Sequence, residues 1–147
     1  FYAEHRIARW QGGWGAEGGT LVLTQRERIR RWRYTWLLDV DAGTSRMWFH
    51  LNERDRYNSP GRPLRRPLPN GRYVLHQKGD AVYFSGSGST DKGDRPFLDL
   101  RDMKTGEVER LFRCDPGRYE TFEAFAGNED TFVMRSESAI NAATSSA

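Results

Sequence analysis

Two short segments carry residue types that serine hydrolases use. Ser89 and Lys92 have the Ser-x-x-Lys spacing, and residues 104–106 read Lys-Thr-Gly; both patterns occur in serine β-lactamases. That chemistry needs the serine and the lysine one turn apart on a helix, whereas these matches fall in a Gly/Ser-rich loop and an expected hairpin turn. The Gly-x-Ser-x-Gly motif of α/β-hydrolases is absent from the sequence. We therefore expect no catalytic residue in this chain.

The histidines and the cysteine give no site either. His5, His50 and His76 are far apart and have no cysteine or carboxylate at ligand spacing, so no metal is expected. Cys114 is single, which excludes an internal disulfide, and as a nucleophile it would need a positioned base. No phosphate-binding glycine loop or dinucleotide fingerprint is present, so no cofactor is expected.

One segment, residues 26–36, combines positive charge with aromatic rings. Arginines with neighbouring aromatics can hold phosphates and stack bases, so this segment is a candidate site for anionic ligands or nucleic acid. The simpler interpretation is a hairpin tip with solvated or paired arginines. The net charge of +3 is too small to indicate a nucleic-acid partner, and nucleic acid is not the expected partner. The candidate binding residues are Arg26, Arg28, Arg30, Arg31, Trp32, Arg33, Tyr34 and Trp36.

The elements that would position these residues are short strands. No segment shows a sustained helical period, so the sequence predicts an all-β fold. Two segments, 55–70 and 85–96, are rich in Pro and Arg or in Gly and Ser and are expected to be loops. The expected strands cover residues 19–24, 34–40, 46–51, 71–76, 80–85, 97–102, 109–113, 122–126 and 131–134.

The chain also contains an internal repeat. Asp39-x-x-x-Gly43-x5-Phe49 recurs as an identical pattern over residues 102–112, and residues 20–23 match residues 131–134. Two unrelated hairpins that share turn chemistry are the alternative explanation, since hairpins often reuse Asp and Gly. A repeated four-stranded antiparallel unit that must stack on its neighbours is typical of a β-propeller blade.

The repeat predicts a partial β-propeller of about two four-stranded antiparallel blades plus the start of a third. Its units cover roughly residues 7–55, 56–117 and 118–138, followed by a tail, 139–147, that is expected to fray. The chain begins with Phe1 in the middle of a pattern, so an upstream part is expected. No run of 18 apolar residues is present, and no membrane-spanning helix is expected.

Several segments in a fixed order resemble one known family. They are Asp-Arg-Pro-Phe-Leu-Asp at 94–99 and the segments 102–107, 110–113, 119–122 and 135–138. In this order they resemble the propeller domain of the prolyl oligopeptidase family of serine peptidases, and most closely the glutamyl endopeptidase branch. The likeness extends from about residue 10 to residue 138.

The resemblance implies a parent enzyme with two domains. In such an enzyme, a propeller caps an α/β-hydrolase domain that holds a Ser, Asp and His triad. This chain would then be a non-catalytic propeller fragment that gates the access of peptide substrates, with the α/β-hydrolase domain as its partner. A peptidase selective for acidic residues would also gain from positive charge near its entrance. The alternative is a stand-alone module that binds anionic ligands or nucleic acid through residues 26–36.

An unclosed propeller has a consequence for assembly. Its end blades would expose apolar faces, and its third unit would leave an unpaired strand edge near residues 131–134. We expect the chain to self-associate by blade stacking or strand exchange. Light scattering across a dilution series measures this, and a sharp monomer of 17.0 kDa at high concentration would contradict it.

Overall fold

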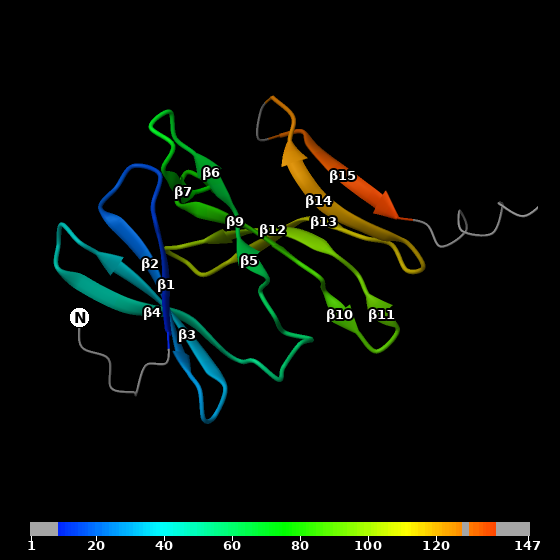
Figure 1. Cartoon of the computed structure of the whole chain (residues 1–147), viewed down its shortest axis with the longest axis horizontal. Coiled ribbons are helices and arrows are strands. Elements are labelled where there is room, and N and C mark those ends of the chain that lie inside the picture. Colours follow the sequence, from blue (N-terminus) through cyan, green and yellow to red (C-terminus); the bar gives the residue numbers. More distant parts are fainter. Residues whose placement is uncertain (1–8, 128–129, 138–147) are drawn as a thin grey trace, which may run out of the picture.

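The computed structural model describes residues 9–127 and 130–137, and this part of the chain contains strands, turns and loops but no helix. The all-β prediction is therefore confirmed. Figure 1 shows a four-stranded sheet, a second sheet and a two-stranded hairpin arranged one after another. Within the described ranges there is no helix of the length and apolarity needed to cross a membrane.

The first sheet is a meander in which each strand pairs antiparallel with its neighbour in sequence. Its first strand lies outside the segments expected from sequence, because two glycines weaken its strand propensity. One of them, Gly13, is needed for a close approach, since an added Cβ would lie 3.0 Å from a methyl group of Leu75. The strands are β1 (Arg9–Trp14), β2 (Thr20–Glu27), β3 (Trp32–Asp39) and β4 (Thr44–Asn52).

The second sheet has the strand order β13-β12-β9-β5, with β8 also paired to β9. β9 is therefore the central strand, and its first four residues are all buried. The strands are β5 (Arg62–Pro63), β8 (Gln77–Lys78), β9 (Ala81–Gly86), β12 (Phe97–Asp102) and β13 (Val108–Arg113).

Three two-stranded pairs complete the described part, and each of them is antiparallel. The longest, at the right of Figure 1, forms the hairpin that follows the second sheet. The pairs are β6 (Arg65–Pro67) with β7 (Tyr73–Leu75), β10 (Ser89–Thr90) with β11 (Gly93–Asp94), and β14 (Tyr119–Phe125) with β15 (Phe132–Glu137).

The loop predictions for 55–70 and 85–96 are wrong in part, because these segments contain β5, β6, β10 and β11. β5 contains Pro63, which has no N–H to donate. It is nevertheless accommodated because β5 lies at the edge of its sheet and pairs only with β9. The predicted tail, 139–147, and His5 lie outside the described residues.

The repeated Asp and Gly residues close equivalent turns. In the β3–β4 turn, the backbone N–H of Ala42 donates to Oδ1 of Asp39 (2.9 Å). In the β12–β13 turn, two backbone N–H groups donate to Oδ1 of Asp102, at 2.6 and 2.7 Å. Gly43 and Gly106 follow with φ of 66° and 76°, a left-handed conformation that glycine adopts without strain. The sequence repeat thus encodes the same turn twice.

The two repeated strand pairs also share an irregularity. The register of β3–β4 shifts after Thr35 and leaves Trp48 without an opposing residue. The register of β12–β13 shifts after Leu98 and leaves Leu111 without one. Trp48 and Leu111 occupy the same place in the sequence repeat, directly before Phe49 and Phe112. The two strand pairs thus share the position of a β-bulge as well as their turn.

The final hairpin repeats the opening of the first sheet. The N–H of Gly15 donates to the carbonyl of Thr20 (2.7 Å), and the N–H of Ala126 donates to the carbonyl of Thr131 (2.8 Å). The loops joining β1 to β2 and β14 to β15 therefore close in the same way. The ladder pairs that flank them are Trp14 with Leu21 and Phe125 with Phe132.

The main core lies between the first and second sheets. The bulge in β4 turns both Trp48 and Phe49 toward Phe84 of β9, with ring centroids 5.6 and 6.1 Å from the Phe84 ring. The indole N–H of Trp48 donates to the carbonyl of Asp102 (3.1 Å), which ties β4 to the second sheet. The buried members of this cluster are Val22, Leu37, Leu75, Val82, Phe84 and Met103.

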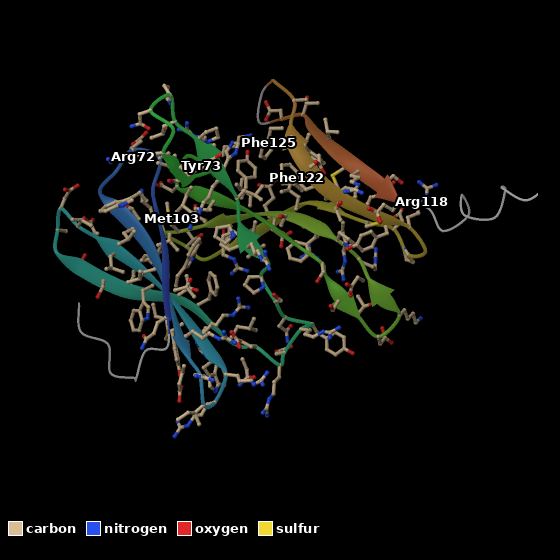
Figure 2. All side chains as sticks on the ribbon, viewed as in Figure 1. Arg72, Tyr73, Met103, Arg118, Phe122 and Phe125 are labelled. Carbon is tan, nitrogen blue, oxygen red and sulfur yellow. The ribbon has the colours of Figure 1, made fainter. Side chains whose placement is uncertain are left out.

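A second apolar interface lies on the other face of the second sheet. The Phe125 ring of β14 packs 4.7 Å from Tyr83 and 4.5 Å from His76, measured between centroids. Phe122 and Phe125 point from the hairpin toward the second sheet in Figure 2. Phe112 of β13 also contacts Phe132 of β15 at 6.2 Å. The second sheet is therefore covered on both faces.

Phe84 offers a direct test of the main core. It is 1% exposed, so Phe84→Ala should lower the free energy of unfolding by about 3–5 kcal/mol through lost burial and a residual cavity. Tyr57→Ala, at a side chain that is 67% exposed, is the matched control and should change stability by about 0.5 kcal/mol or less. Urea unfolding followed by tryptophan fluorescence measures both, and equal effects would contradict this assignment.

The β12–β13 turn should contribute to acid sensitivity. The backbone N–H of Thr105, and after it that of Lys104, stabilises the carboxylate and lowers the pKa of Asp102. A lowered folded-state pKa gives stability above the unfolded pKa of about 3.9 that is lost as pH falls through the folded value. Asp102→Asn keeps an acceptor without the titration, so its stability should fall less steeply below about pH 4. Identical acid limbs in urea unfolding would contradict this.

Candidate functional site

A cleft of about 730 Å³ separates the first sheet from β5 and the loop before it. Its volume lies within the range of about 300–1,000 Å³ that is usual for small-molecule sites. Alternation along β3 places Arg33 and Thr35 on the face that lines the cleft. Pro60 and Arg62 line the opposite wall, and Phe84 of β9 also borders the cleft. We refer to this feature as the inter-sheet cleft.

The guanidinium group of Arg33 is only partly paired with a carboxylate. Its Nε is buried without a hydrogen-bond partner and lies 3.8 Å from Oε1 of Glu53. The same carboxylate forms a closer ion pair with Arg26, at 2.7 Å between Nη2 and Oε2. One carboxylate thus serves two guanidinium groups.

Arg62 and Arg65 add charge from the other wall. Nη2 of Arg65 donates to the carbonyl of Gly12 (2.6 Å), so this side chain bridges β6 and β1. Arg62 is exposed and forms no hydrogen bond or ion pair with its side chain within the part of the chain described. Among the described residues that line the cleft, none is acidic. Within this part of the chain, three arginines therefore meet the cavity and no carboxylate does.

A fourth arginine lies behind the aromatic lining. The guanidinium carbon of Arg101 is 5.0 Å from the ring centroid of Phe49 and 5.8 Å from that of Phe84. Burial lowers the pKa of Arg101, and the nearby Asp99 carboxylate opposes this shift. Asp99 itself is bonded to Arg110 through both carboxylate oxygens, at 2.8 and 3.0 Å. Its charge is therefore already compensated.

The residues of the 26–36 segment do not form one surface. Arg26 and Arg33 lie on the inner face of the first sheet and share Glu53. The turn between β2 and β3 carries Arg28, Arg30 and Arg31, all exposed. The aromatic residues Trp32, Tyr34 and Trp36 alternate with Arg33 and Thr35 along β3, so they lie on the outer face.

The outer-face aromatics form a ring cluster with His50. The centroids of Trp32 and Tyr34 lie 6.4 Å apart, and that of His50 lies 5.4 Å from Trp32. The Tyr34 hydroxyl donates to Oε2 of Glu27 (3.4 Å). Burial, followed by the neighbouring Glu27 carboxylate, raises the pKa of Tyr34. The segment thus separates into an aromatic face and a cationic face.

The serine hydrolase patterns have no catalytic geometry. Ser89 begins the short β10–β11 hairpin, and its hydroxyl donates to Oδ1 of Asp94 (2.9 Å). Lys92 lies in the turn of that hairpin, not one helical turn away. Lys104 belongs to the β12–β13 turn, where its Nζ lies 2.7 Å from Oδ2 of Asp80. These residues serve local turn structure.

The histidines and the cysteine also have structural surroundings. His76 packs between Tyr83 and Phe125, and His50 packs on Trp32. Cys114 is buried, and its Sγ lies 3.2 Å from the carbonyl of Arg118 and accepts from the N–H of Glu120 at 3.3 Å. Among the described residues, no three His, Cys, Asp or Glu side chains gather as a metal site would require.

Sequence reasoning identified Arg33 but missed Arg62 and Arg65. Both belong to the Pro/Arg-rich segment that was expected to be a loop. Prolines hold such a segment extended, so it can form edge strands and direct arginines toward a neighbouring sheet. That composition was the available signal, but only the strand pairing shows that it faces β3 across a cleft.

Comparisons with known proteins agree on one similarity. The chain is 32% identical over 144 residues to a probable chloroplastic glutamyl endopeptidase of Arabidopsis thaliana, covering 90% of this chain and 15% of that protein. It is 32% identical over 113 residues to the protein of the same name from Oryza sativa subsp. japonica, covering 72% and 12%. No protein-family model matches the chain, and no solved structure does so.

The similarity is therefore to a small part of much longer proteins. The chain spans about a seventh of the length of the Arabidopsis thaliana relative, while most of its own length is aligned. The likeness to glutamyl endopeptidases inferred from the sequence is supported at this level. It concerns one segment of such proteins.

Proposed function

We propose that this chain is a non-catalytic part of a β-propeller in a serine peptidase of the prolyl oligopeptidase family. Its blades are residues 7–55 and 56–117, and a third begins with 118–138. The observation that carries the proposal is the recurrence of one strand-pairing register, including the bulge at Trp48 and Leu111. Two successive propeller blades are expected to share their strand pairing, including the position of a β-bulge.

The packing of the sheets supports the same proposal. The first sheet, the second sheet and the final hairpin pack through aromatic side chains: Phe49 contacts Phe84, and Tyr83 contacts Phe125. Propeller blades stack face to face in this way, because a single blade cannot bury both faces. The similarity to two plant proteins named as probable glutamyl endopeptidases supplies the link to peptidases.

The role that follows is control of access rather than catalysis. A propeller placed over an α/β-hydrolase domain restricts the size of peptide that reaches the nucleophile. The sequence has no Gly-x-Ser-x-Gly motif, so the nucleophile belongs to another part of the parent protein. The α/β-hydrolase domain of the parent is then the partner of this chain, and peptides are the substrate of the whole.

Hydrolysis assays test both parts of this proposal. The 147-residue chain alone should not cleave glutamyl or prolyl chromogenic peptides, because its sequence lacks the Gly-x-Ser-x-Gly motif that presents the nucleophile. Turnover that survives purification and is lost in Ser89→Ala would contradict the non-catalytic assignment.

The gating role needs the parent protein. Its coding sequence should contain Gly-x-Ser-x-Gly and later Asp and His codons. The full-length enzyme should cleave short peptides far faster than an unfolded protein such as reduced casein. Loosening the propeller with Phe84→Ala should reduce this size selectivity while Tyr57→Ala leaves it unchanged. Equal selectivity in all three proteins would refute gating by this region.

A further inference from the structure

We propose that the inter-sheet cleft binds a small organic anion. Its carboxylate or phosphate group is held by Arg33, Arg62 and Arg65, and its apolar part lies against Phe49 and Phe84. This site is independent of the proposed gating role, since it depends only on groups that face the cleft. It also differs from the candidate binding segment 26–36, with which the cleft shares only Arg33.

Charge is the first argument for an anionic ligand. Among the described residues that line this cavity, the three arginines meet no acidic side chain. Glu53, which forms an ion pair with Arg33, is held more closely by Arg26, at 2.7 Å. The Nε of Arg33 is buried without a hydrogen-bond partner and has only the longer contact with Glu53, at 3.8 Å. A buried cation is stabilised by an opposite charge, and an anion in the cleft would balance the charge of the three lining arginines.

The geometry of arginine favours carboxylates and phosphates in particular. A guanidinium presents a planar fork of N–H donors that matches two oxygens of either group. Within the described part of the chain, the Arg62 side chain forms no hydrogen bond or ion pair. It can therefore bind an anion without breaking an internal contact. Arg65 is anchored to the Gly12 carbonyl by Nη2 and is therefore held in place at the cleft wall.

The remaining lining indicates that the ligand has an apolar body. Phe49, Leu51 and Phe84 border the cleft and provide aromatic and aliphatic surface. The hydroxyl groups of Thr24 and Thr35 are hydrogen bonded to each other (3.4 Å), which leaves one of their two protons to donate to a ligand oxygen. Arg101 lies behind the Phe49 and Phe84 rings, which adds positive potential at that wall. This combination fits an aryl or alkyl carboxylate or phosphate better than a bare inorganic ion.

Titration of the 147-residue chain with phenyl phosphate and 3-phenylpropionate tests the proposal, with neutral 3-phenyl-1-propanol as the matched probe. Binding is followed by the NMR signals of the arginine Nε–Hε groups and by tryptophan fluorescence. We expect saturable binding of at least one anion, a shift of the Arg33 signal, and weakening by added salt. The two anions show whether phosphate or carboxylate is preferred.

Variants locate the site. Arg62→Ala should raise the Kd by about tenfold or more, and Arg62→Lys should have a smaller effect because it keeps the charge without the fork. Arg28→Ala, at the exposed hairpin tip, is the control and should leave the Kd unchanged. Because Arg62 has no side-chain partner in the described part, its variants should keep the wild-type unfolding midpoint. If the unfolding midpoint of these variants does change, the shift of the Arg33 Nε–Hε signal in the wild-type titration tests the proposal instead.

Three results would overturn the proposal. The first is that neither anion saturates the chain up to about 10 mM, which corresponds to binding weaker than about −2.7 kcal/mol. The second is that the neutral alcohol binds as tightly as the anions, which would indicate an apolar cavity only. The third is that Arg28→Ala weakens binding as much as Arg62→Ala, which would move the interaction to the hairpin tip.

Discussion

The described structure depends on the burial of the second sheet from both sides. Along β9, Val82 and Phe84 face the first sheet while Tyr83 faces the final hairpin, and all three are almost fully buried. A sheet that is apolar on both faces is unstable in water unless other layers cover it. The first sheet and the hairpin supply those layers. The bulge in β4 matters for this reason, because it lets two consecutive side chains, Trp48 and Phe49, reach the same partner.

Much of this fold could be predicted from local sequence. Alternation and turn residues indicated the main strands, and the Asp-x-x-x-Gly repeat indicated two equivalent turns. Two kinds of element could not be found in this way. β1 contains a glycine pair that approaches a neighbouring strand closely, and β5 contains a proline tolerated only at an edge. β1 is a strand because it pairs with β2 and fits closely against Leu75, and β5 is a strand because it pairs with β9. The contacts with Leu75 and β9 are distant in sequence and leave no local signal.

The same limit applies to the candidate site. Arg33 could be identified because it belongs to a segment with a high positive charge. That segment, however, is divided between the inner face of the first sheet, its outer face and a hairpin tip. Period-two alternation predicts the division once β3 is known to start at Trp32. The participation of Arg62 and Arg65 depends on the stacking of two sheets, which no local pattern encodes. The positive charge could be predicted from the sequence, whereas the cavity that the arginines line could not.

The connectivity of the strands has a consequence for how the chain folds. In the first sheet and the final hairpin, every ladder joins strands that are adjacent along the chain, so few residues must be closed into loops before hydrogen bonds form. The second sheet differs, because β5 must find β9 across the intervening β6, β7 and β8. The largest entropy cost of loop closure therefore falls on the second sheet, which the first sheet and the final hairpin cover on its two faces. We therefore expect the second sheet to assemble more slowly than the first sheet and the final hairpin, whose apolar surfaces stay exposed until it forms.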